Sequence, residues 1–77
     1  MVNNNNKRDK FKLLAEKRTD RILKNLELLG NLHNKANYEY SEADYRKILR
    51  AIRAATNEVQ SLFEGKKQER KKFVLED

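Results

Sequence analysis

Hydrophobic residues recur at steps of three and four along the stretch from Ser41 to Glu64. At about 100° of rotation per residue, such positions share one face of an α-helix. The pattern predicts an amphipathic helix over residues 42–64, which must cover its apolar face with another helix or with a partner. We call this face the α-helical seam. It comprises Tyr45, Ile48, Ile52, Ala55, Val59 and Leu62, and Leu49, Thr56 and Phe63 widen it on one side.

A narrower pattern of the same spacing precedes it and predicts a first helix over residues 7–29. Asn6 is the expected N-cap, with Asp9 at the reciprocal position of a capping box. Gly30 is expected to end the helix in the left-handed conformation. The apolar positions are Phe11, Leu14, Ala15, Ile22, Leu26 and Leu29.

The second helix has the clearest boundary signals in the chain. Ser41 and Asp44 have the spacing of a capping box, and Gly65 follows the last apolar position. The asparagine-rich connection between the helices predicts irregular backbone with a short helical turn around Leu32–Ala36. Residues 1–6 are then a leader and residues 66–77 a charged tail.

These elements predict an all-α fold, in which residues 7–65 form an antiparallel two-helix hairpin with a short third helix. A chain of this size has a marginal core, so we expect the hairpin to dimerise into a helical bundle. Three leucines of the first helix lie off its apolar stripe and would be covered by a second copy, unless they are ordinary exposed leucines. They are Leu13, Leu23 and Leu28.

Composition argues against catalysis and against a bound cofactor. The 77 residues contain no cysteine and one histidine, so disulfides and thiolate metal sites are excluded. We expect His33 to be an ordinary hydrogen-bonding side chain of the connection. No catalytic grouping, phosphate-binding glycine loop or metal-ligand spacing is present, so we expect no enzyme, no cofactor, no metal and no small-molecule substrate.

The sequence has no apolar run of about 18 residues, and its first residues lack the apolar stretch of a secretory signal. We therefore expect a cytoplasmic protein that does not bind a membrane.

The net charge of +6 makes an acidic protein or a nucleic acid a plausible partner. The basic residues of both helices would contact phosphates, unless they only form a solvated face. Tyr38 and Tyr40 would either cap the open end of the hairpin or stack on bases. The basic candidates are Lys17, Arg21, Lys24, Arg46, Lys47, Arg50 and Arg53.

A compact apolar tip, Phe73-Val74-Leu75, follows the charged run of the tail. It either folds back on the end of the hairpin near Phe11 and Phe63 or docks into another protein. Phe73 and Leu75 therefore join the three off-stripe leucines as candidate protein-contact residues.

Three segments resemble a group of small, uncharacterised bacterial helical proteins associated with mobile elements. They are Phe11-Lys-Leu-Leu-Ala-Glu-Lys-Arg18, Gly30-Asn-Leu-His-Asn-Lys-Ala-Asn-Tyr-Glu-Tyr40 and Lys71-Lys-Phe. The resemblance implies a helical accessory protein and brings no assigned activity or site residues.

The function expected from the sequence is a non-enzymatic protein-interaction module: an adaptor, regulator or inhibitor that binds itself, an acidic protein, or both. The alternative is a nucleic-acid-binding accessory protein that uses the basic helix faces. A third hypothesis, a structural piece of a larger assembly, predicts a chain that stays partly unfolded until its partner is added.

Overall fold

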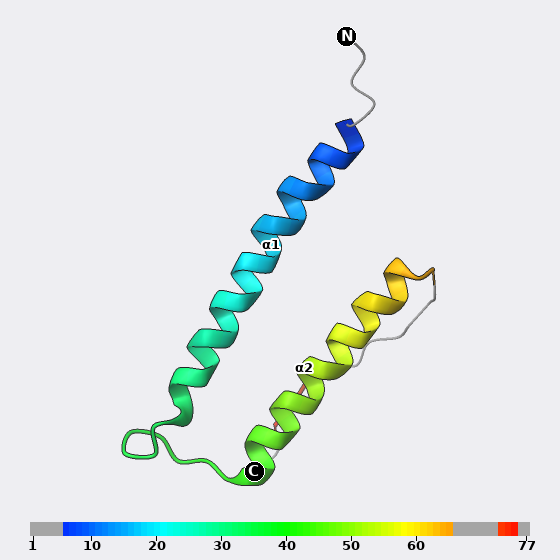
Figure 1. Ribbon diagram of the computed structural model, residues 1–77. Helices are drawn as coiled ribbons and strands as arrows, with labels where there is room; N and C mark the ends of the chain where they lie inside the picture. The colour runs from blue at the N-terminus through cyan, green and yellow to red at the C-terminus, as the bar shows by residue number, and fades with distance from the viewer. Residues whose placement is uncertain (1–5, 66–72, 76–77) are drawn as a thin grey trace. The chain divides into compact units, whose positions relative to one another are not determined.

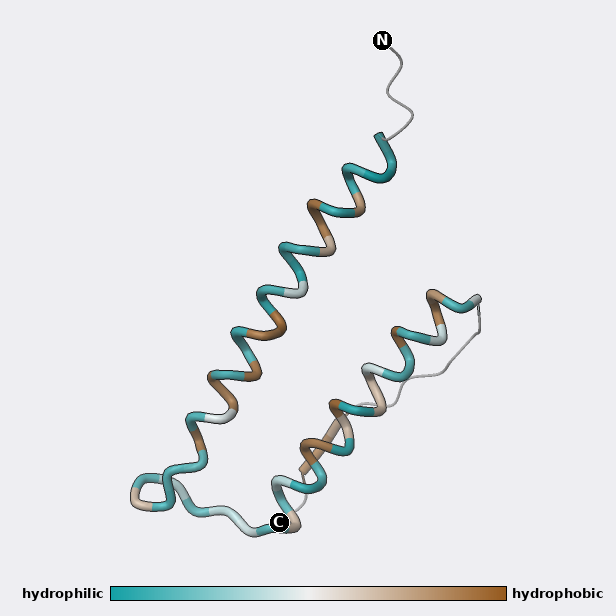
Figure 2. Tube along the Cα trace, in the orientation of Figure 1, coloured by the Kyte–Doolittle hydropathy of each residue, from teal (hydrophilic) through white to brown (hydrophobic). Residues whose placement is uncertain are grey.

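The computed structural model describes residues 6–65 and 73–75, and within them the chain is all-helical, as predicted (Figure 1). Helix α1 spans Asn6–Gly30, the 3-10 helix η1 spans Asn31–His33, and helix α2 spans Glu42–Phe63. The chain divides into two units, Met1–Tyr38 and Glu39–Asp77, each built on one long helix. Hydrophobic positions recur along both helices about once per turn (Figure 2).

Helix α1 agrees with its predicted span to within one residue at each end. Its 25 residues are about 37 Å long at 1.5 Å per residue. Asn6 is the first residue of the helix and not its N-cap, so the cap position lies outside the described residues. Ala15 and Leu29 are half-buried, whereas every other residue of the helix is exposed.

The prediction that Gly30 ends α1 in a left-handed conformation is wrong. Gly30 has φ −62° and ψ −28°, which is right-handed helical geometry. The chain continues directly into η1. A 3-10 turn can donate hydrogen bonds to the last carbonyl groups of a helix, so Gly30 needs no positive φ. One such contact comes from His33, whose Nδ1 donates to the Gly30 carbonyl oxygen at 2.9 Å. His33 is thus a hydrogen-bonding residue of the connection, as expected.

The remainder of the connection is organised by Asn34. Its carbonyl oxygen accepts the backbone N–H groups of Asn37 and Tyr38, at 3.1 and 3.0 Å. Its side-chain oxygen accepts the Ala36 N–H at 2.9 Å, an asparagine turn. The short helical turn expected around Leu32–Ala36 is therefore a 3-10 helix that begins at Asn31, followed by this turn.

Helix α2 begins at the predicted capping box. The Ser41 hydroxyl accepts the Asp44 N–H at 3.1 Å, and the Asp44 carboxylate accepts the Ser41 N–H at 3.0 Å. At the other end Gly65 has φ 85°, the left-handed geometry that favours glycine, and its N–H donates to the Leu62 carbonyl oxygen at 3.1 Å. The helix ends at Phe63, one residue before the predicted end.

The α-helical seam is shielded in the middle of α2 and open at its end. Ile48, Ile52 and Ala55 are half-buried, as is Ala51 beside them. Exposure rises to 63% at Leu62 and 73% at Phe63. No residue of the described segments is fully buried, so neither helix has a closed core around it.

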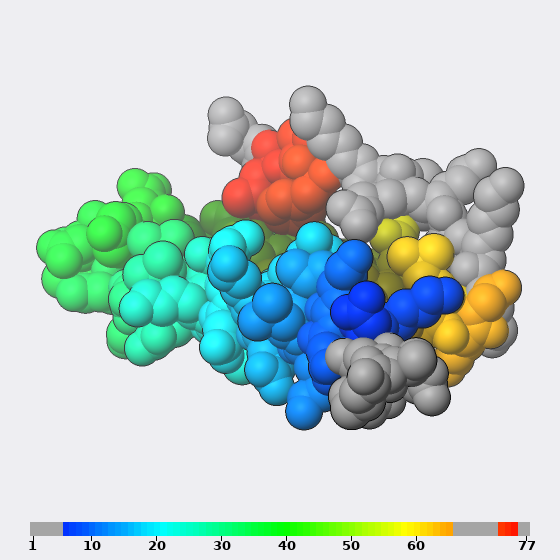
Figure 3. Space-filling view, turned by 90° about the horizontal axis from the view of Figure 1, so that it is seen from above, coloured from blue at the N-terminus to red at the C-terminus, as the bar shows by residue number. Residues whose placement is uncertain are grey.

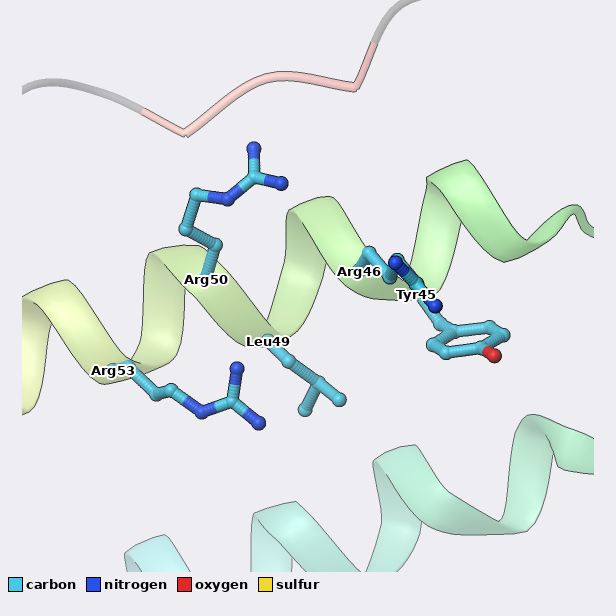
Figure 4. Close-up of a pocket in the computed structure, with 5 residues that line it drawn as sticks. All are labelled: Tyr45, Arg46, Leu49, Arg50 and Arg53. Carbon is cyan, nitrogen blue, oxygen red and sulfur yellow. The ribbon is translucent and has the colours of Figure 1, made fainter.

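Residues 73–75 run beside α2, at the level of Arg50 (Figures 1 and 4). This position is about half a helix away from Phe63, the neighbour that the fold-back prediction gave them. Phe73, Val74 and Leu75 remain about half-exposed, and their atoms are visible at the molecular surface in Figure 3.

Candidate interaction surface on helix α2

An open hollow of about 380 Å³ lies along α2, and all the residues that line it belong to this helix (Figure 4). Its lining combines guanidinium groups with an aromatic ring and an aliphatic side chain. We call this surface the arginine face, and it comprises Tyr45, Arg46, Leu49, Arg50 and Arg53.

Helical spacing brings these five residues together. Arg46 and Arg53 are seven residues apart, so they differ by only about 20° in rotation and lie about 10.5 Å apart along the axis. Leu49 lies between them along the helix. In Figure 4 the side chains of Tyr45 and Leu49 point to the same side of α2, and the guanidinium of Arg53 bends towards that side. Arg50 points to the opposite edge.

Arg46 is held by an ion pair with Glu42, one turn earlier. Both side chains are largely exposed, at 65% and 59%, so the pair contributes only about 0.3–0.5 kcal/mol. It also uses a negative charge that already stabilises the N-terminal end of the helix dipole. Arg46 is therefore oriented but still accessible.

Arg50 and Arg53 differ from Arg46 because neither makes an ion pair with any residue in 6–65 or 73–75. No acidic residue stands four positions before either of them, since Arg46 and Leu49 occupy those places. Their charges are therefore available to a ligand.

Tyr45 contacts a residue outside α2, which helical spacing alone does not reveal. Its ring meets the ring of Tyr40 edge to face, with centroids 6.4 Å apart and planes at 75°. Sequence reasoning assigned Tyr45 to the seam and Tyr40 to capping or base stacking, so it missed their pairing. The capping box was the available signal, because it fixes where the connection enters α2.

Lys47 does not belong to the arginine face, although the sequence grouped it with the three arginines. It is half-buried, and it lies about 100° around the helix from Arg46. The sequence therefore identified three of the five residues of the hollow as a group and added one that lies elsewhere.

The basic candidates of α1 form a separate row in the other unit. Lys17, Arg21 and Lys24 are exposed and share one side of the helix at spacings of four and three. Leu13 and Leu28 lie on the same side, before and after this row. Leu23 is about 120° away from Lys17, so the three off-stripe leucines do not form one surface.

The two tyrosines that were expected either to cap the open end of the hairpin or to stack on bases fall in different units. Tyr38 ends the first unit and is 48% exposed, whereas Tyr40 is half-buried in the second.

Residues 6–65 and 73–75 contain no group of three or more histidine or acidic side chains placed to hold a metal ion. None of their helices combines the length and apolarity that crossing a membrane requires.

No family model, curated protein or solved structure matches the chain. The resemblance to mobile-element proteins stays a prediction.

Proposed function

We propose that this chain is a non-enzymatic protein-interaction module that works by burying the apolar sides of its helices against protein. In this proposal α1 and α2 form an antiparallel hairpin through their apolar stripes, and the hairpin pairs with a second copy or with another protein. The observation that carries the proposal is the exposure of large apolar side chains on both helices, such as Ile22 at 57% and Leu62 at 63%.

Full burial of a leucine, isoleucine or phenylalanine contributes about 1.5–3 kcal/mol relative to exposure. A helix that is apolar along one side gains most of its stability from packing and little from its intrinsic propensity. Both helices therefore gain stability when protein covers them, which is the thermodynamic basis of an interaction module.

Sedimentation velocity combined with circular dichroism over a range of concentrations tests this proposal. We expect association, and helicity that rises with it. Ile52→Asp places a charge in the seam and should abolish association, whereas Asn57→Asp adds the same charge on the opposite side of α2 and should not. A monomer whose helicity does not depend on concentration and is equal in both variants would overturn self-association.

Nucleic-acid binding is the second candidate, and the free charges of Arg50 and Arg53 favour it. Three arginines in the hollow predict a binding constant that falls with salt at a slope of about −3 on logarithmic axes. Titration of duplex DNA and single-stranded RNA at low and moderate salt tests it. Absence of binding at low salt would dispose of this candidate.

A further inference from the structure

We propose that the arginine face of α2 binds an acidic amphipathic helix of a partner protein. In this arrangement, carboxylates of the partner meet Arg46 and Arg53 while an apolar side chain between them packs on Leu49 and Tyr45. The inference rests on the proposed function, because it assumes that the chain binds protein, and it names the partner's chemistry for one surface.

The side chains of the arginine face are spaced at an interval that a second α-helix can match. Arg46 and Arg53 are about 10.5 Å apart along α2, and Leu49 lies between them. A partner helix lying along the hollow repeats its own side chains at the same interval of seven residues. Carboxylates seven residues apart would therefore reach both arginines, and an apolar residue three or four positions from each would reach Leu49.

The chemistry of the cations favours carboxylates. A guanidinium presents five donors in a planar fork that binds a carboxylate through two parallel hydrogen bonds. Arg53 is free for such a contact within the described segments, and Arg46 needs only to exchange its exposed bond to Glu42. The exchange costs little, because exposed pairs of this kind are weak.

The apolar part of the face distinguishes a protein partner from a nucleic acid. Leu49 is 37% exposed and Tyr45 44%, and both border the open hollow. A phosphate backbone leaves these carbons in water, whereas an amphipathic helix covers them and gains their burial. Tyr45 is also already in contact with Tyr40, which restrains it as a platform for an unstacked base.

Fluorescence anisotropy with a labelled synthetic peptide tests the proposal. The probe is a peptide of about 20 residues, long enough to be helical, with glutamates seven residues apart on the same side as its leucines. The control peptide has the same composition, with its glutamates on the side opposite its leucines. We expect the full-length protein to bind the probe at least about tenfold more tightly than the control peptide, a difference of about 1.4 kcal/mol.

Variants locate the binding on the arginine face. Arg53→Gln should weaken binding about tenfold, and Arg53→Lys should weaken it by an intermediate amount because it keeps the charge but loses the fork. Lys17→Gln is the matched control, because it removes one charge from α1, and it should change binding by less than about twofold. Leu49→Ser should also weaken binding, whereas nonspecific attraction by charge would leave it unchanged. Circular dichroism establishes that each variant keeps its helices.

Each contrary result has a distinct meaning. Equal binding of both peptides, or equal effects of Arg53→Gln and Lys17→Gln, would overturn the proposal in favour of general charge attraction. Tighter binding of a DNA duplex that Arg53→Gln weakens would overturn it in favour of a phosphate site. If the wild-type protein does not bind the probe peptide but still associates through the seam at Ile52, this inference is overturned and the proposed function stands.

Discussion

At the scale of single residues, the ends of α2 are fixed by local hydrogen bonds. Ser41 and Asp44 satisfy each other's backbone N–H groups, which α-helical bonding would leave without partners. Gly65 adopts a left-handed backbone geometry, in which any residue with a side chain would be strained. These contacts join residues that are close in the sequence, so their formation does not depend on the contacts that the rest of the chain makes.

Removal of the cap should destabilise α2. Ser41→Ala deletes the hydroxyl that accepts the Asp44 N–H, and we expect it to lower helix stability by about 1 kcal/mol. Ser41→Asp keeps an acceptor and should behave like the wild type. Thermal unfolding followed by circular dichroism measures the difference, and equal unfolding curves for all three proteins would contradict the role of the cap.

The two glycines should respond to alanine in opposite ways. Gly30 has right-handed geometry and open space where a Cβ would stand, so Gly30→Ala should stabilise α1 by about 0.5–1 kcal/mol. Gly65 has equal space but a φ of 85°, so Gly65→Ala should destabilise the end of α2. Helicity and melting temperature of the two variants measure these effects. A shift of the same sign in both would refute the backbone assignment.

At the scale of elements, α2 carries an apolar seam and, along one edge of it, the arginine face, and the two share Tyr45 and Leu49. The seam is half-buried at Ile48 and Ile52, whereas the arginine face carries two charges that lack partners in the described part of the chain. Helix α1 divides its charges instead: Lys17, Arg21 and Lys24 form one row, and its acidic residues lie beside them. The two helices therefore carry different arrangements of charge.

Protection from hydrogen exchange should vary along α2. Local opening is easiest where few apolar side chains are covered. We therefore expect the amides near Ile48–Ala55 to exchange more slowly than those near Leu62 and Phe63, where side chains are most exposed. NMR-detected exchange measures the profile. A uniform rate along α2 would mean that its covered middle confers no additional stability.

At the scale of the whole molecule, the net charge of +6 opposes pairing of identical copies while the apolar sides favour it. Added salt screens the repulsion between charges that are farther apart than the Debye length, which is about 8 Å at physiological ionic strength. We therefore expect self-association to strengthen as salt rises from low to physiological concentration. Sedimentation at several salt concentrations measures this. Dissociation on adding salt would indicate contacts between opposite charges in place of apolar ones.

The sequence by itself determined the helices of this protein and their boundaries, because capping bonds, glycine geometry and helical periodicity act over a few residues. The capping box at Ser41, the pair of Glu42 with Arg46 and the end at Gly65 follow from that spacing. Two boundary predictions fail: Asn6 lies inside α1, and at Gly30 two outcomes, a left-handed end or a 3-10 turn, satisfy the same carbonyl groups.

Only the tertiary structure decided which side chains share a surface. The ring contact of Tyr40 with Tyr45 and the path of residues 73–75 beside α2 depend on where the chain runs outside the helices. Periodicity gives each residue an angle on its own helix. It does not say which side chains pack against that residue, because such contacts join residues that are far apart in the sequence.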